Sequence, residues 1–485
     1  MPDRFPAPVY ADTVLRPNFE DAKKYFLDSL LDIHYAHTRM LACQGILSAV
    51  EEGALLAALD GIDRAHIDSA EYDGGSEDLF FFTEQLLEQS CGRDLAGKMH
   101  TARSRNDIAL TLYRMAARVE LLKVAANTAE LRRVLLDLAG KHLETVMPAH
   151  THTQPAQPTT LGHYLLAVCE FLARDADRIR GAFARVNLSP MGAAAITTSG
   201  FPIDRQKTAQ LLGFEGLSEN SYGAIAAIDY ITESASVIAI AMVSLGKLVQ
   251  DLLLWSTREF GFLRLSDAFV QVSSIMPQKR NPVALEHTRI LASRALGQAQ
   301  AVLTCAHNTP FGDINDSEDD LQPLVFAMFG DAVRVLKLLA GVMGAAEVDC
   351  GRLEMRAGKD FLTVTELADT LVRREGMSFR EAHGLVAETV RACGENDQPA
   401  AIAAMLKRIR PSLLSTEAEI VQALDPENFI RVRTTTGGPA PEQTRDALRR
   451  ANGQQVRMET WAGKKRALLD SARAALRGRS ASTPA

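Results

Sequence analysis

Three long stretches without proline constrain the fold of this chain more than any other feature. No proline occurs in residues 18–147, 203–276 or 324–398, although the chain contains 19 prolines. Because proline removes a backbone N–H group and clashes with the preceding helical turn, stretches of this length are typical of long helices. Alternation of apolar and polar residues, which would indicate strands, is hardly visible. We therefore expect an all-α protein.

Helical periodicity within these stretches predicts where the long helices lie. Residues 26–57 predict one or two helices with a break near Gly45, and residues 107–145 and 225–258 each predict one long helix. The segment Val237–Leu245 is apolar on nearly every face, so we expect that helix to be buried on all sides. A helix of about 35 residues is roughly 50 Å long. Helices of that length usually pack into a bundle, often one that subunits share.

These patterns divide the chain into three expected regions. Residues 1–106 form an N-terminal helical domain, and residues 107–355 form a central bundle of long helices that also mediates oligomerisation. Residues 356–485 form a C-terminal domain of shorter helices, which glycine-rich turns punctuate.

Composition excludes several classes of function. The net charge is −7 and the sequence pI is about 5.9, which argues against a nucleic-acid or anionic-membrane partner. The six cysteines form no C-x-x-C pair, as expected for reduced structural thiols. Met1–Pro17 lacks an apolar signal core, and the run Val237–Leu245 is too short to span a bilayer. We therefore expect a cytoplasmic protein.

The most informative polar cluster is the segment 273–282, which two prolines interrupt. It predicts an ordered loop in which Ser273 takes a proton, while Lys279 and Asn281 hold the negative charge that the proton leaves behind. Glu286 follows at the start of a helical pattern. A carboxylate there is suited to orienting a histidine, but it is equally typical of a first-turn glutamate favoured by the helix dipole.

A second polar cluster, His100–Asp107, precedes the helix predicted from residue 107. Its side chains Ser104, Arg105 and Asn106 offer hydroxyl, guanidinium and amide donors for a carboxylate. The start of the helix adds free N–H groups and positive dipole. The alternative is an ordinary helix N-cap with solvated arginines.

A third cluster, His150–Thr160, lies in a proline-punctuated turn before another helix. A histidine side chain commonly titrates near neutrality, so this residue type, here His152, is suited to donating a proton to a leaving amine. The alternative is a pair of turn histidines with no function. Neither His150 nor His152 has a cysteine or carboxylate at ligand spacing nearby, so we expect no metal.

Together the three clusters suit an elimination reaction. A C–H bond next to a carboxylate is a poor acid, and its deprotonation creates a dianion that needs fixed positive charge and donors. Ser273 serves as base, Lys279 and Asn281 stabilise the dianion, and His152 protonates the departing nitrogen. Serine is a weak base and must be activated by local donors. No glycine-rich phosphate loop is present, so nucleotide hydrolysis has little support.

The same clusters resemble the signature regions of the fumarase/aspartase superfamily, and most closely those of argininosuccinate lyase. The resemblance rests on Gly97–Asp107, on Thr151–Pro158 with Gly162-His163, and on Ser273–Pro282 with Glu286. The last segment is highly specific for the superfamily, whereas Arg103–Asp107 points to the argininosuccinate branch. Weaker matches extend the resemblance over roughly residues 28–385.

This resemblance implies an all-α homotetramer with a shared core of twenty helices, in which three subunits build each active site. It implies that Ser273 is the catalytic base and His152 the proton donor, paired with Glu286. The reaction implied is reversible β-elimination of fumarate from an N-substituted aspartate, without a cofactor. The residues matching the set that binds the succinyl group are Ser104, Arg105, Asn106, Thr151, Gln154, Lys279 and Asn281.

Several positions depart from the argininosuccinate lyase pattern. A glutamine is replaced by Ile108, a histidine by Phe80, an arginine by Ile228 and an aspartate by Gly223, and the N-terminal W-G-G-R-F is missing. These positions belong mostly to the amine half of the substrate site. We therefore expect the same chemistry on a different amine, such as an ethylenediamine-disuccinate-type aminopolycarboxylate.

The acid-rich segment Asp313–Asp320 is suited to a cationic amine, but it is also typical of a solvated loop. Three further alternatives for the function of the chain remain open from the sequence. These are a true argininosuccinate lyase, a lyase of the same superfamily acting on adenylosuccinate or aspartate, and a non-catalytic structural relative.

Overall fold

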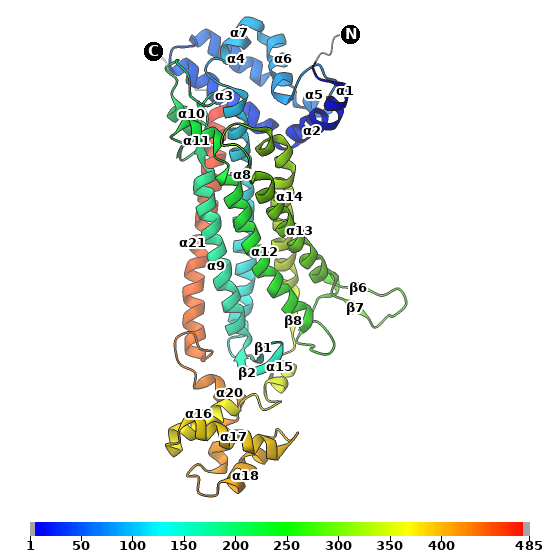
Figure 1. The fold of residues 1–485 in the computed structure, drawn as a ribbon, viewed down its shortest axis with the longest axis vertical. Coiled ribbons are helices and arrows are strands. Elements are labelled where there is room, and N and C mark those ends of the chain that lie inside the picture. The colour runs from blue at the N-terminus through cyan, green and yellow to red at the C-terminus, as the bar shows by residue number, and fades with distance from the viewer. Residues whose placement is uncertain (1–4, 479–485) are drawn as a thin grey trace.

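The computed structural model describes residues 5–478, which form an elongated helical molecule with a helical cap at each end of a long bundle (Figure 1). Among residues 5–100, the N-terminal cap contains seven α-helices. They are α1 (Pro8–Tyr10), α2 (Arg16–Tyr25), α3 (Leu27–Cys43), α4 (Ala49–Asp60), α5 (Arg64–Ser69), α6 (Leu79–Cys91) and α7 (Arg93–Met99).

Long helices form the central bundle and confirm the expected all-α fold. The predicted break near Gly45 separates α3 from α4, with Gly45 at φ +70°. The bundle consists of α8 (Arg105–Lys141), α9 (Leu161–Val186), α12 (Asp229–Trp255), α13 (Val283–Ala306), α14 (Gln322–Ala345) and α21 (Pro441–Arg477). Shorter helices α10 (Arg205–Leu211), α11 (Ser221–Ala226) and α15 (Cys350–Ala357) connect these elements.

The C-terminal cap is a small helical unit with its own hydrophobic core, centred on residues such as Leu367, Leu406 and Ile420. Its helices are α16 (Val364–Glu375), α17 (Phe379–Cys393), α18 (Pro399–Ile409), α19 (Glu417–Ala423) and α20 (Pro426–Arg431). The chain then returns along the bundle as α21.

Strands are short and occur in pairs. The longest pair is the antiparallel hairpin of β1 (Val146–Thr151) and β2 (Gln154–Thr160). The others are β3 (Leu188–Ser189) with β4 (Gly216–Leu217), β5 (Leu263–Arg264) with β8 (Glu347–Val348), and β6 (Gln271–Val272) with β7 (Arg280–Asn281). They orient loops at the helix ends and add little to the core.

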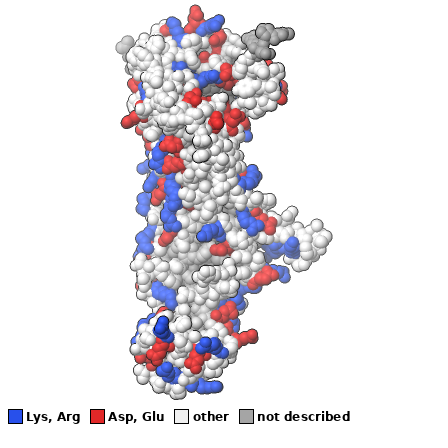
Figure 2. Space-filling view, viewed as in Figure 1, with Lys and Arg blue, Asp and Glu red and all other residues white. Residues whose placement is uncertain are grey.

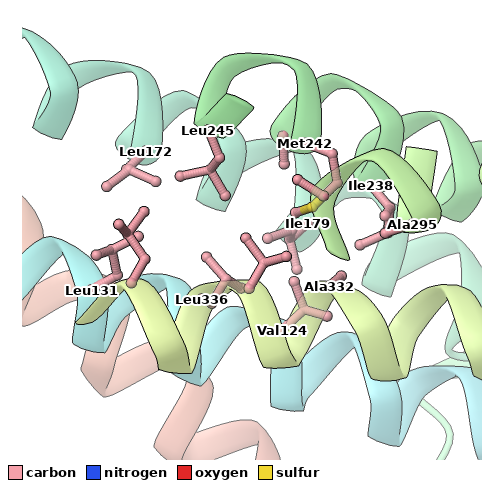
Figure 3. Close-up of a cluster of buried hydrophobic side chains, with 14 of the residues drawn as sticks. Val124, Leu131, Leu172, Ile179, Ile238, Met242, Leu245, Ala295, Ala332 and Leu336 are labelled. Atoms are coloured by element: carbon pink, nitrogen blue, oxygen red, sulfur yellow. The ribbon is translucent and has the colours of Figure 1, made fainter. Parts of the chain in front are cut away.

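Aliphatic side chains from five helices fill the centre of the bundle (Figure 3). Leu131 of α8 and Leu245 of α12 have no exposed surface. Burial of each such side chain stabilises the fold by about 1.5–3 kcal/mol. Other members of this cluster are Val124, Leu172, Ile179, Ile238, Met242, Ala295, Ala332 and Leu336.

The helix α12 departs from the expectation that it is buried on all sides. Ile240 and Val243 keep 43% and 52% of their surface exposed, because α8, α9, α13 and α14 cover only part of the helix. Within residues 5–478, α12 alone is long and apolar enough to span a membrane by length and composition. Its buried face packs into the bundle, so its apolar character already has a structural explanation.

The helix α21 also differs from the expected C-terminal domain, because it packs along α8 and α9 in the bundle. It contacts the bundle through small and amide side chains such as Ala451, Gln455 and Ala462. The fully buried Arg132 of α8 donates to the carbonyl of Ala451 (3.0 Å) and to Oε1 of Gln455 (2.9 Å). The boundaries at residues 106 and 355 remain predictions.

Candidate active site

Ser104, Arg105 and Asn106 form the first turn of α8, as the second polar cluster predicts. Ser104 is the N-cap: its Oγ accepts from the backbone N–H of Asn106 (3.4 Å) and lies 3.0 Å from Oδ1 of the same residue. The Nδ2 group of Asn106 donates to the carbonyl of Ala195 (3.2 Å). The hydroxyl and amide therefore lie together at the positive end of a helix of 37 residues.

A buried carboxylate, Asp107, anchors this turn. It accepts from the backbone N–H groups of Ser104 (2.8 Å), Gly192 (2.8 Å) and Ala194 (3.0 Å). Burial raises the pKa of Asp107 to about 6, although the three N–H donors oppose that rise. Asp107 thus holds the loop around residue 193 against the start of α8.

Arg105 lies at the expected place but already has partners within the chain. It donates to Oε1 of Glu77 (2.9 Å) and to Oδ2 of Asp78 (3.0 Å), and its guanidinium lies 5.1 Å from the ring centroid of Phe81. A substrate carboxylate would have to compete with two carboxylates for this cation. Sequence reasoning did not identify Glu77 and Asp78, because the contact joins segments 27 or more residues apart.

The same turn of α8 borders a cavity of about 230 Å³ that lies between the N-terminal cap and the loop before α14. Tyr113 lines its floor and donates to Oδ1 of Asp319 (2.6 Å). Arg105 is the one basic residue among the described lining residues. Six carboxylates also line the cavity: Glu77, Asp78, Asp313, Glu318, Asp319 and Asp320.

Burial and nearby negative charge raise the pKa values of Asp78, Glu318 and Asp319. Burial, together with a hydrogen bond to Asp313, raises the pKa of Glu318 to about 8. Burial also raises the pKa of Asp319 and of Asp78 above the usual range. Glu318 therefore keeps its proton near neutrality. The acid-rich loop is partly buried against a cavity, unlike the fully solvated loop that was the alternative.

His152 lies at the tip of the β1–β2 hairpin, at the opposite end of α8. His152 and Thr153 form the two-residue turn, with φ of +51° and +61°, a backbone form that matches the type I′ turn. Thr151, His152 and Gln154 are all exposed. The hairpin thus presents the proposed proton donor and two binding side chains to the surface.

Ser273 begins the loop between β6 and β7, which projects from the side of the bundle (Figure 1). Its Oγ accepts from the backbone N–H groups of Ile275 (3.3 Å) and Met276 (3.1 Å). Hydrogen bonds to the charged form lower a pKa, so these donors favour an alkoxide at Ser273. Ser274, Ile275 and Met276 are exposed.

The remaining predicted residues of segment 273–282, together with Glu286, line an open groove of about 1260 Å³ beside the β6–β7 loop. Lys279, Asn281 and Glu286 are among the lining residues, and Glu286 lies in the first turn of α13. The groove places a cation, an amide and a carboxylate on one side of the bundle. No partner for the side chain of Lys279 occurs among residues 5–478 within hydrogen-bonding distance.

One chain does not bring the three polar segments together. Ser104 and the β1–β2 hairpin stand at opposite ends of α8, whose 37 residues span about 55 Å. The Ser273 loop projects sideways from the bundle (Figure 1). A site that uses all three segments must therefore draw them from more than one copy of the chain.

Comparison with known proteins defines the class of the molecule. Residues 33–297 match the family model described as "Lyase", and residues 361–431 match the one described as "Argininosuccinate lyase C-terminal". The first match spans part of the N-terminal cap and the bundle as far as α13, and the second spans the C-terminal cap. The chain is therefore a carbon–nitrogen lyase, in agreement with the expected class of enzyme.

Individual relatives narrow the class. Argininosuccinate lyase 2 of Agrobacterium fabrum is 44% identical over 461 residues, covering 93% of this chain and 91% of the relative. Argininosuccinate lyase of Methanoculleus marisnigri is 38% identical over 93% of this chain and 92% of its own length. This chain belongs to the fumarase/aspartase superfamily as an argininosuccinate lyase-like member.

Solved structures agree with this placement. EDDS lyase in complex with formate matches with a TM-score of 0.84 and 32% identity, covering 96% of this chain and 95% of that one. A variant of EDDS lyase with bound fumarate matches equally well. Class II fumarase from Schistosoma mansoni matches with a TM-score of 0.66 at 16% identity, which reflects the fold alone.

Proposed function

We propose that this lyase catalyses reversible β-elimination of fumarate from an N-substituted aspartate. Ser273 removes the proton next to a carboxylate, the C–N bond breaks, and the nitrogen leaves with the bonding electrons. His152, oriented by Glu286, protonates that nitrogen, so the products are fumarate and a neutral amine. The observation that carries this reaction is the pair of N–H groups that point at Ser273 Oγ at 3.1 and 3.3 Å.

Fixed donors hold the carboxylates of the succinyl group in this proposal. Lys279 supplies the charge that balances the dianion formed by deprotonation, and Asn281 adds an amide donor. Ser104 and Asn106 add donors at the N-terminus of α8. Thr151, Gln154 and Arg105 complete the set, with Arg105 exchanging an internal carboxylate for that of the substrate.

We propose that several copies of the chain build each site. The bundle exposes an apolar surface that includes Ile240 and Val243 of α12 and Ile290 and Leu303 of α13. A broad uncharged band runs along the bundle in Figure 2. Because exposed apolar surface favours association, further copies are the natural cover for this band. A homotetramer with shared helices would then place three distant segments in one site.

The amine half of the substrate carries a positive charge in this proposal and is not arginine. The acid-lined cavity beside Asn106 favours an ammonium group and disfavours a carboxylate. Arginine released from argininosuccinate would bring its own carboxylate toward that cavity, whereas a diamine would not. A compound of the ethylenediamine-disuccinate type supplies the second, cationic nitrogen but adds the carboxylates of its second succinyl group, so a diamine with a single succinyl group meets this requirement best.

An amine panel tests the proposal. Purified enzyme is incubated with fumarate and diamines, arginine, ammonia or uncharged amines, and the loss of fumarate absorbance is followed. We expect diamines to be the best partners. True argininosuccinate lyase activity is the second candidate, favoured by the names of the relatives at 44% and 38% identity. Arginine with a catalytic efficiency far above every other amine would establish that candidate instead.

A further inference from the structure

A buried chain of side chains lies beneath the loop that precedes α8. The side chain of Arg103 has no exposed surface. Its Nη1 group lies 2.8 Å from Nδ1 of His34 on α3, and its Nη2 group donates to Oε1 of Glu84 on α6 (2.7 Å). The guanidinium also lies 5.7 Å from the ring centroid of Phe80. One side chain of the loop thus connects two helices of the N-terminal cap.

The chemistry of these contacts fixes the protonation of the histidines below the loop. Arginine can only donate, so Nδ1 of His34 accepts, and the imidazole of His34 is neutral. Burial, reinforced by the Arg103 charge, holds the pKa of His34 well below its usual range. His37, one helical turn further along α3, lies with Nε2 2.9 Å from the carbonyl of Thr101 and must donate to it.

The backbone of the loop is held in a form that needs such support. Ala102 has a φ of +60°, a left-handed conformation that costs a non-glycine residue about 1–2 kcal/mol. His37 holds Thr101, the residue before Ala102. Arg103, the residue after Ala102, is itself held by His34. Asp107 holds the next turn from the other side. Ser104 and Asn106 therefore stand between two anchors.

We propose that Arg103 is a positioning residue that presets Ser104 and Asn106 for a substrate carboxylate, through its buried contacts with His34 and Glu84. This inference rests on the proposed function, since it assigns the carboxylate site to the start of α8. Arg103 itself stays beneath the loop and does not reach the cavity wall. Its effect is geometric, because a displacement of about 1 Å at a binding group can cost about 100-fold in rate.

The test compares three variants of the full-length protein. Arg103→Gln removes the cation and both of its contacts. Arg103→Lys keeps a charge that reaches Glu84 but loses the planar fork that reaches His34. Arg114→Gln is the matched control, because it removes a different buried arginine, which lies within α8. The Nη1 group of Arg114 donates to the carbonyl of Arg185 (2.9 Å), away from the loop. Steady-state kinetics with fumarate and hydrogen–deuterium exchange of residues 104–108 are measured for each.

We expect Arg103→Gln to lower kcat/KM for fumarate by about 100-fold, with KM changing more than kcat, and to speed exchange at residues 104–108. Arg103→Lys should recover part of both effects, and Arg114→Gln should show neither. Unchanged KM and unchanged local exchange, or equal effects in the Arg114 control, would overturn the inference. If Arg103→Gln does not fold, Arg103→Lys and His34→Gln give the same comparison.

The two proposals fail in different ways. A wild-type enzyme that consumes no fumarate with any amine would refute the proposed function. Exchange at residues 104–108 would still decide whether Arg103 orders the loop.

Discussion

The start of α8 and the β6–β7 loop contain similar numbers of polar side chains, yet the fold treats them differently. The first is held by buried groups, with Asp107 accepting three backbone N–H bonds and Arg103 fixed from below. The second projects into solvent, with Ile275 exposed over 83% of its surface. One chain therefore fixes the proposed carboxylate-binding turn by itself but leaves the loop of Ser273, the proposed base, to be ordered by a ligand or another copy.

The largest effect should follow from Ser273→Ala. Loss of the base should lower kcat by about 10²–10⁴-fold. Assembly, measured by light scattering, should stay unchanged because the exposed loop packs against little else. Ser274→Ala is the matched control, since it removes a neighbouring exposed hydroxyl. Normal turnover by Ser273→Ala would show that Ser273 is not the catalytic base.

His152→Asn should have the next largest effect, and one that depends on the leaving group. An alkylamine leaves poorly without a proton, so its elimination should slow by about 100-fold. Elimination of an arylamine, which is a better leaving group, should slow much less. The ratio of the two rates is the measurement. Equal slowing for both amines would show that His152 does not act as the acid.

Asn106→Ala tests the proposed carboxylate-binding turn at the start of α8. Loss of an amide donor to a carboxylate costs about 1.5–3 kcal/mol, so KM for fumarate should rise about 10- to 100-fold with a smaller change in kcat. Asn127→Ala, on the same helix, is the control because its side chain bonds only the carbonyl of Lys123. A fall in kcat with constant KM would place Asn106 at the chemical step instead.

The smallest effect concerns the acid cavity and is a pH dependence of stability. Burial raises the pKa of Glu318 from 4.5 to about 8, so between these pH values the native state holds a proton that the unfolded state has lost. The contribution of Glu318 to the free energy of unfolding therefore falls as the pH rises through this window. Glu318→Gln should remove this loss and raise Tm by a few degrees at pH 8.

The control for that variant is the same comparison at pH 5, where the carboxyl is protonated in the native protein and little difference is expected. A Tm difference between Glu318→Gln and wild type that stays constant from pH 5 to pH 8 would contradict the assignment. Added diamine should narrow the difference at pH 8, because a bound cation replaces the proton between Glu318 and Asp313.

Of the six bundle helices, α8 and α12 could be predicted from the sequence, because their signals are local. Proline-free apolar periodicity predicted α8 and α12 within a few residues, and Gly45 correctly marked the end of α3. The place of α21 could not be predicted in this way. Its buried side chains include Ala451, Gln455 and Ala462, and it receives a buried arginine from α8, so its apolar periodicity is weak.

The candidate site shows the same division between local and distant information. The capping role of Ser104 and the turn at His152 follow from local sequence. The ion pairs of Arg105 with Glu77 and Asp78, and the contact of Arg103 with His34, join segments far apart in the chain. Such contacts depend on the fold. The separation of the three segments follows from the length of α8, but only the fold shows that no loop closes the gap.

Mixing two impaired variants tests the central claim that each site draws its segments from different copies of the chain. Ser273→Ala and His152→Asn are each purified, shown to be strongly impaired with an alkylamine, then unfolded together and refolded as mixed oligomers. Shared sites predict that fumarate release rises in the mixture, because some sites receive both intact segments. A mixture no more active than its parents, although hybrid oligomers are demonstrated, would contradict the account.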